Sequence, residues 1–243
     1  MAIERSEALI LQTGPFSEQD KLITFFTREK GILRGIAKGA RKFGNRFGSS
    51  LEPPSHVFIV YYEKEGRDLV TVSQCELQES FFDLQCDSRV SFSLCYYAEL
   101  VQEFVPLHSR EDILFRLLLR TLQALKKGGE LELLSAYFEA WLLRAGGLEP
   151  DLRACGTCGG ALVQSAWLSP RLDGALCDGC AAHKKDIVPA ALHPFIIWTK
   201  KNPPPTEPVS DFTPEELQGI RKFFQRVLIY HVERVPKSLR FLS

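Results

Sequence analysis

Two pairs of cysteines are the residues in this chain best suited to hold a metal ion. Two residues separate the thiols within each pair, and 18 residues separate the pairs. This spacing is typical of a four-cysteine zinc site, because four thiolates complete a tetrahedron at about 2.3 Å from the ion. We expect one Zn²⁺ per chain, with disulfides or an iron–sulfur cluster as alternatives and His183 as a less favoured ligand. The expected ligands are Cys155, Cys158, Cys177 and Cys180.

Four sulfur ligands leave no position on the ion for an activated water, so the predicted site is structural. The sequence also lacks the common phosphate-binding loop, the dinucleotide-binding loop after a strand and the Gly-x-Ser-x-Gly nucleophile elbow. His231 and Glu233 have the His-x-Glu spacing of zinc deaminases. They follow both cysteine pairs, whereas in deaminases they precede a Pro-Cys-x-x-Cys pair. We therefore interpret them as packing and surface residues of a helix.

Basic residues are concentrated near the N-terminus. Seven Lys or Arg and one acidic residue lie between Arg28 and Arg46, although the whole chain has 30 basic and 30 acidic residues. Glycines, Phe43 and Phe47 alternate with these cations. Such a loop can follow a nucleic-acid strand, because cations neutralise phosphates and aromatic rings stack on unpaired bases; an ordinary solvated loop is the alternative. The candidate DNA contacts are Arg34, Lys38, Arg41, Lys42, Phe43 and Arg46.

The N-terminal third contains short apolar segments separated by turn residues, and no helical stretch long enough for a parallel crossover. This pattern predicts a small closed barrel, and a five-stranded oligonucleotide-binding (OB) barrel is favoured over a meander or an SH3-like barrel. The basic segment would join its third and fourth strands. The expected strands are residues 7–12, 21–27, 31–37, 56–62 and 69–73.

After Asp83 the apolar residues recur at helical spacing. Ser109-Arg-Glu-Asp112 has the form of a capping box and predicts a helix that begins there, and a second helix is expected at about 130–145. Thr213-Pro-Glu-Glu216 predicts a further helix with Thr at its N-cap and Pro at its first position.

Together these patterns predict a multidomain α+β chain. We expect an OB-fold nucleic-acid-binding domain at 1–80 and a helical domain at 81–243, with a zinc module inserted at about 150–185.

The composition is ordinary for a globular protein, with 45% hydrophobic and 25% charged residues. No apolar run is long enough to cross a bilayer, and the charged N-terminus does not fit a signal peptide. We expect no membrane partner and a reducing cytoplasm, in which the three remaining cysteines would be small buried thiols. These are Cys75, Cys86 and Cys95.

Several motifs, in order along the chain, resemble those of the RecO family of bacterial DNA repair proteins. The motifs occur along nearly the whole length of the chain. Two of them are the cysteine pairs, Cys155-Gly-Thr-Cys158 and Cys177-Asp-Gly-Cys180. The others are Thr27-Arg-Glu-Lys-Gly31, Ala37-Lys-Gly-Ala-Arg41, Phe138-Glu-Ala-Trp-Leu-Leu-Arg-Ala-Gly-Gly147 and Lys237-Ser-Leu-Arg-Phe241.

The resemblance implies a non-enzymatic recombination mediator of the RecFOR pathway. Such a protein binds single- and double-stranded DNA, anneals complementary strands, contacts the C-terminal tail of the single-stranded-DNA-binding protein SSB, and with RecR helps RecA load. Lys38 and Arg41 fall on the family's Lys-Gly-Ala-Arg motif and carry over as DNA contacts. Phe43-Gly-Asn-Arg46 departs from the family's usual continuation. A zinc-containing enzyme acting on nucleic acid and a protein-only interaction scaffold are the alternatives.

Overall fold

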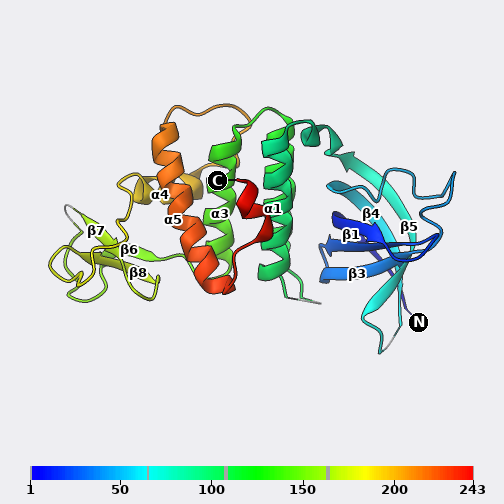
Figure 1. Cartoon of the computed structure of the whole chain (residues 1–243), viewed down its shortest axis with the longest axis horizontal. Helices are drawn as coiled ribbons and strands as arrows, with labels where there is room; N and C mark the ends of the chain where they lie inside the picture. Colours follow the sequence, from blue (N-terminus) through cyan, green and yellow to red (C-terminus); the bar gives the residue numbers. More distant parts are fainter. Residues whose placement is uncertain (1, 65, 107–108, 163–164, 243) are drawn as a thin grey trace. The chain divides into compact units, whose positions relative to one another are not determined.

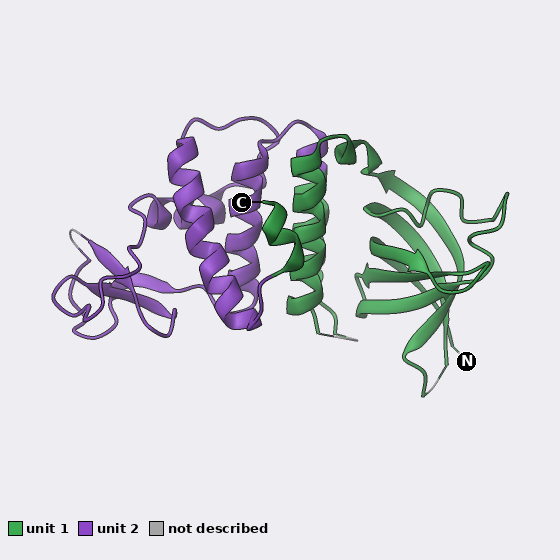
Figure 2. Ribbon diagram, viewed as in Figure 1, with its two compact units in different colours: residues 1–122, 236–243 green, residues 123–235 purple. Residues whose placement is uncertain are grey.

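The computed structural model of the chain describes residues 2–64, 66–106, 109–162 and 165–242. The chain forms two compact units, which Figure 2 distinguishes by colour. The first unit comprises residues 1–122 and 236–243, and the second comprises residues 123–235. Within the described residues, no helix is both long and apolar enough to cross a membrane.

The first unit begins with the predicted five-stranded barrel (Figure 1). Its strand order is β1-β2-β3-β5-β4, and β4 pairs with β1 to close it. Neighbouring strands are antiparallel except β3 and β5, which run parallel. This arrangement confirms the predicted fold class. The strands are β1 (Ala2–Pro15), β2 (Lys21–Thr27), β3 (Gly31–Ala37), β4 (Ser55–Glu63) and β5 (Leu69–Ser80).

Alternating apolar side chains fill the barrel, as a half-buried strand requires. Phe25 and Tyr61 meet edge to face inside it, with ring centroids 5.8 Å apart. Gly35 lies where a Cβ atom would come within 2.9 Å of the Val70 side chain, so only glycine fits without a shift. The other buried residues of this core include Ala8, Ile10, Ile23, Leu33, Val57, Ile59 and Val72.

Two strands extend well beyond their predicted limits. β1 and β5 continue through polar residues such as half-buried Glu4 and exposed Glu76, where the apolar alternation has ended. Their ladders with β4 continue nevertheless, since Glu4 pairs with Tyr61 and Glu76 with Phe58. Backbone pairing, and not side-chain pattern, therefore sets the ends of these strands.

The rest of the first unit is helical: η1 (Phe82–Cys86), α1 (Ser88–Phe104), most of α2 (Asp112–Lys126) and η2 (Lys237–Phe241). Asp87 caps α1 by accepting backbone hydrogen bonds. The backbone N–H and the hydroxyl of Ser238 both donate to the Glu99 carboxylate, at 2.9 and 2.5 Å. These bonds hold the C-terminal segment against α1.

Two predictions for this region are wrong. The helix expected from Ser109 begins at Asp112, because the Glu111 carbonyl accepts the first helical hydrogen bond, from the N–H of Phe115. Cys86 and Cys95 are exposed, so they are not the small buried thiols expected; Cys75 is half-buried.

The second unit packs α3 (Leu131–Ala145), α4 (Leu192–Lys201) and α5 (Pro214–Val232). Thr213 and Glu216 form the predicted capping box at the start of α5. Between α3 and α5, Arg221 makes an ion pair with buried Glu139 at 3.5 Å. A small sheet inserted between α3 and α4 has the strand order β6-β8-β7. Its strands are β6 (Asp151–Cys155), β7 (Ala166–Leu168) and β8 (Gly174–Cys177).

Candidate metal centre and nucleic-acid interface

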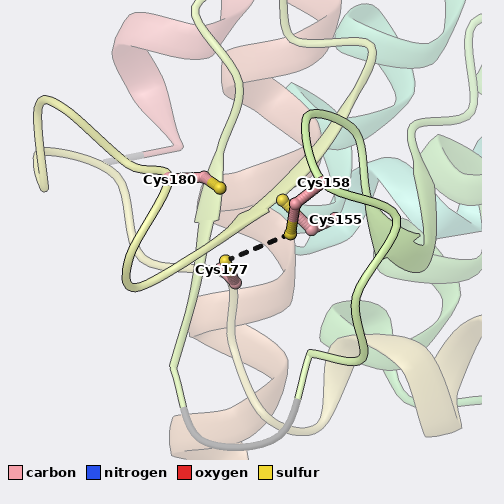
Figure 3. Close-up of side chains that lie close together, drawn as sticks. All are labelled: Cys155, Cys158, Cys177 and Cys180. Atoms are coloured by element: carbon pink, nitrogen blue, oxygen red, sulfur yellow. Dashed lines mark hydrogen bonds between the residues drawn. The ribbon is translucent and has the colours of Figure 1, made fainter.

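The four predicted ligands meet in the small sheet of the second unit. Their sulfur atoms all lie within 4.8 Å of one another, and Figure 3 shows them converging on one point. The Sγ atoms of Cys158 and Cys177 are 3.8 Å apart. A tetrahedron of sulfurs about 2.3 Å from a central ion has edges of about 3.8 Å, so the donor set fits a thiolate-bound metal.

Strand pairing explains why the cysteines converge. Cys155 ends β6 and Cys177 ends β8, and these two strands are parallel neighbours, so the turn after each strand lies at the same edge of the sheet. The N–H of Gly159 donates to the carbonyl of Cys155 at 2.8 Å, and that glycine adopts a φ of +70°. The turn thus returns Cys158 towards Cys155. In the second turn, the N–H of Cys180 donates to the carbonyl of Cys177 at 3.0 Å.

The surrounding groups shift the pKa values of two of the thiols in opposite directions. Backbone N–H groups of Cys158, Cys177 and Thr157 lower the pKa of the Cys155 thiol to about 6. Hydrogen bonds with the sulfurs of Cys177, Cys158 and Cys155 raise the pKa of the Cys180 thiol to about 12. The thiolate of Cys155 is therefore favoured and that of Cys180 disfavoured, and a bound cation would favour the thiolate form of both.

No further ligand joins this group among the described residues. The cluster of potential metal ligands contains the four cysteines and not His183. All seven cysteines are free thiols, so a disulfide does not occupy the site. The arrangement can hold a metal ion, and four sulfur donors would close its coordination sphere to water.

The basic residues follow β3 and continue through turns towards β4, within the first unit. We call residues 38–46 the basic loop. All six predicted DNA contacts have exposed side chains: Arg34 on β3, and Lys38, Arg41, Lys42, Phe43 and Arg46 in the loop.

The basic loop is anchored to the barrel by buried apolar side chains. Ala40, Phe47 and Leu51 belong to the barrel core and are 5%, 4% and 1% exposed. Phe47 therefore cannot stack on a base, contrary to the suggestion that both phenylalanines of this segment are available. Phe43 has a fully exposed ring. The buried residues fix the backbone, and the cations between them point into solvent.

A second loop, residues 16–20 between β1 and β2, supports the basic loop. The N–H of Gly39 donates to the Asp20 carboxylate at 2.8 Å. The N–H of Arg41 donates to the carbonyl of Gln19 at 3.0 Å, and its guanidinium donates to the carbonyl of Ser17 at 2.6 Å. Sequence reasoning missed this loop, since Ser17 and Asp20 indicate a turn but not its distant partner.

The cations differ in how much of their hydrogen-bonding capacity the protein itself uses. Arg46 donates to the carbonyl of Ser73 at 2.9 Å and lies over the Phe47 ring. In the described part of the chain, Lys38 and Lys42 form no ion pair. Both ammonium groups are therefore available to an anionic ligand.

The two cations at the start of the basic stretch have structural partners. Arg28 donates to Asp112 at 2.7 Å and to Glu7 at 3.0 Å, and the bond to Arg28 lowers the pKa of Asp112 below its usual value. Lys30 pairs with Glu63 at 2.7 Å, which raises the pKa of the lysine. These ion pairs belong to the barrel and its junction with α2.

Two family profiles cover nearly the whole chain. The profile described as "Recombination protein O N terminal" matches residues 1–81, and "Recombination protein O C terminal" matches residues 87–240. The chain belongs to the RecO family. The resemblance inferred from the motifs is thereby confirmed.

Individual RecO sequences agree with this assignment. A DNA repair protein RecO from Koribacter versatilis is 36% identical over 175 residues, which are 72% of this chain and 71% of that protein. One from Roseiflexus sp. is 31% identical over 99% of this chain and 85% of its own length. One from Pelotomaculum thermopropionicum is 31% identical over 100% of this chain and 94% of its own length.

Proposed function

We propose that this RecO-family protein is a non-enzymatic DNA-binding recombination mediator that acts in the cytoplasm. It binds single- and double-stranded DNA through the basic loop and promotes annealing of complementary strands. With RecR, and by contacting the C-terminal tail of SSB, it helps RecA load on SSB-coated single strands. We assign nucleic-acid binding to a domain at residues 1–80 and contact with the SSB tail to the helical domain at residues 81–243.

One observation carries the DNA-binding assignment. The basic loop is fixed by its buried residues and by the loop at 16–20, yet Lys38 and Lys42 extend from it without an ion pair among the described residues. Neither lysine would have to give up an ion pair in order to bind an anion. Phosphates of a nucleic-acid backbone are the ligands that such groups attract most strongly, through release of condensed counterions.

The cysteine cluster supports a structural role for the metal. We propose that the ion is Zn²⁺, one per chain, because soft thiolates select it and four sulfurs satisfy its tetrahedral preference. Bound there, zinc would supply folding energy to the small sheet and would have no open position for chemistry. This donor set argues against a zinc-dependent enzyme.

The test is an anisotropy titration of the full chain with a labelled single strand at two salt concentrations. Lys38→Glu/Lys42→Glu should weaken binding and reduce the slope of log K against log[salt] by about 1.4, the value for two lost phosphate contacts on a single strand. The control is Lys201→Glu/Lys222→Glu, which makes the same charge change at exposed positions of the second unit.

Equal losses in both double variants would indicate a net-charge effect and contradict the assignment to the basic loop. A parent protein that binds neither single- nor double-stranded DNA would contradict the proposed function and favour a protein-only scaffold.

A further inference from the structure

A surface hollow of about 510 Å³ lies in the first unit, between the basic loop and the loop at 16–20. One wall comes from each loop, and the two walls are joined by the hydrogen bond from Gly39 to Asp20. The lining residues are predominantly polar, and they include Lys38 and Lys42. The side chains that matter for its chemistry are those of Asp20, Lys38, Lys42, Phe43, Asn45 and Arg46.

Phe43 is the least expected of these residues. Its ring is fully exposed, whereas Phe47, four residues later, is 4% exposed and belongs to the barrel core. The exposed ring makes no contribution to packing, and no aromatic contact involves it within the described chain. An aromatic ring presented to solvent beside cations is the usual stacking platform for an unpaired base.

The charges around the ring favour an anionic polymer. Lys38 and Lys42 lie in the same hollow and are not neutralised by ion pairs in the part of the chain that the structure describes. Asp20 contributes the one carboxylate among the lining residues, and its Oδ1 atom already accepts the Gly39 N–H. The acid is thus engaged in holding the loop, and the ammonium groups are left for phosphates.

The hollow is also preformed. The backbone N–H and the side-chain amide of Asn45 both donate to the carbonyl of Lys42, each at 3.2 Å, and so close the turn that presents Phe43. The N–H of Lys42 donates to the carbonyl of Gly39 at 3.0 Å. A ligand that enters this site therefore meets a backbone already ordered, which reduces the entropic cost of binding.

We propose that this hollow is a single-nucleotide subsite that distinguishes unpaired from paired DNA. The Phe43 ring stacks on one exposed base, and Lys38 and Lys42 bind the flanking phosphates. In a duplex the bases are already stacked on their neighbours, so the ring has no base to meet and only the cations contribute. The subsite rests on the proposed DNA-binding function and adds to it a preference for single strands.

The test compares a mixed-sequence single strand with a duplex of the same length, both labelled for anisotropy. Phe43→Ala should lower single-strand affinity about tenfold, within the range for loss of one base–aromatic stack, and should change duplex affinity less than twofold. Phe43→Trp should retain single-strand binding. Lys38→Ala/Lys42→Ala should weaken both complexes, because both depend on phosphate contacts.

A second readout follows stacking directly. In Phe43→Trp, the fluorescence of the new indole should be quenched by the single strand and not by the duplex, after subtraction of the parent signal from its three native tryptophans. An equal loss on both DNA forms in Phe43→Ala, or no loss on the single strand, would overturn the subsite. Failure of the parent to bind any DNA would instead overturn the proposed function.

Discussion

The Asp20 carboxylate accepts a hydrogen bond of 2.8 Å from the backbone N–H of Gly39 and thereby joins two loops that lie between different pairs of strands. An acidic residue beside a cluster of cations would ordinarily be expected to oppose DNA binding. Here the acid fixes the point at which the basic loop leaves β3. By positioning the basic loop, Asp20 should raise DNA affinity, whereas its negative charge should lower it. The two effects can therefore be separated by mutation.

Asp20→Ala should lower single-strand affinity about fivefold even though it removes a negative charge, because a hydrogen bond worth about 1 kcal/mol no longer holds the loop. Asp20→Asn keeps the acceptor oxygen and removes the charge, so its affinity should equal or exceed that of the parent. Anisotropy titrations measure both, and amide exchange at Gly39 should increase only in Asp20→Ala. If both variants bind more tightly, Asp20 acts through its charge alone.

Replacing Cys177 with Ser should release the metal and lower the thermal stability of the second unit, since metal binding at such sites contributes on the order of 10 kcal/mol. DNA affinity per folded molecule should stay unchanged, because the basic loop belongs to the first unit. Metal analysis, X-ray absorption and thermal melting provide the measurements, and four sulfur neighbours around zinc are expected.

Cys86→Ser is the matched control for this substitution. Cys86 is an exposed thiol outside the cluster, so its loss should alter neither metal content nor melting. An absorption spectrum that requires nitrogen or oxygen ligands from the protein would contradict the four-cysteine assignment. Unchanged stability of Cys177→Ser would contradict the structural role.

Local sequence signals predicted those parts of the molecule that depend on local interactions. Thr213 and Glu216 satisfy each other across three residues, so their pairing could be read directly from the chain. The two cysteines of each pair are likewise separated by only two residues, so each pair could be recognised in the sequence alone. Asp20 and Gly39 are separated in sequence by a complete β-hairpin, and nothing near either residue specifies the other.

The two phenylalanines of the basic segment show a further limit. Phe43 and Phe47 have similar neighbours, with glycine following each of them, yet one ring is exposed and the other buried. The difference arises because Phe47 packs into the barrel core together with Leu51, and Phe43 does not. The sequence pattern alone predicts the same role for both rings. Only packing in the folded barrel distinguishes them, because Phe47 belongs to its core.

Arg221→Met should destabilise the second unit by about 3–5 kcal/mol, because it removes the ion pairs of Arg221 with buried Glu139 and with Glu132 in the α3–α5 interface. The side chain of Arg221 is 8% exposed and that of Glu139 is 0% exposed. Chemical denaturation measures the change. Adding Glu139→Gln should recover part of the loss, since the buried charge is then removed.

Arg226→Met is the control for position within α5. Arg226 pairs with Asp186, but its side chain is 46% exposed, so its loss should cost about 0–1 kcal/mol. Similar losses for both arginine variants would mean that burial of the ion pair does not determine its contribution.

Tyr61 makes the stability of the barrel sensitive to alkaline pH. Its hydroxyl is buried and has no hydrogen-bond partner within the described chain, and burial raises the pKa of Tyr61 to about 12 from 10.0. A raised folded-state pKa means that stability is fully present below pH 10 and is lost as the pH rises to about 12. The loss over this window is about 2–3 kcal/mol, at 1.36 kcal/mol for each unit.

Tyr61→Phe should therefore be neutral or slightly stabilising at pH 7, because it removes a buried hydroxyl without a partner, and should be the more stable protein at pH 11 to 12. Denaturation curves at pH 7, 9 and 11 measure the difference between variant and parent, which cancels the titration of Lys30 and other common groups. Tyr62→Phe, at a half-buried position on the same strand, is the control. A Tyr61→Phe variant whose stability falls with pH as steeply as that of the parent would assign the alkaline loss to other groups.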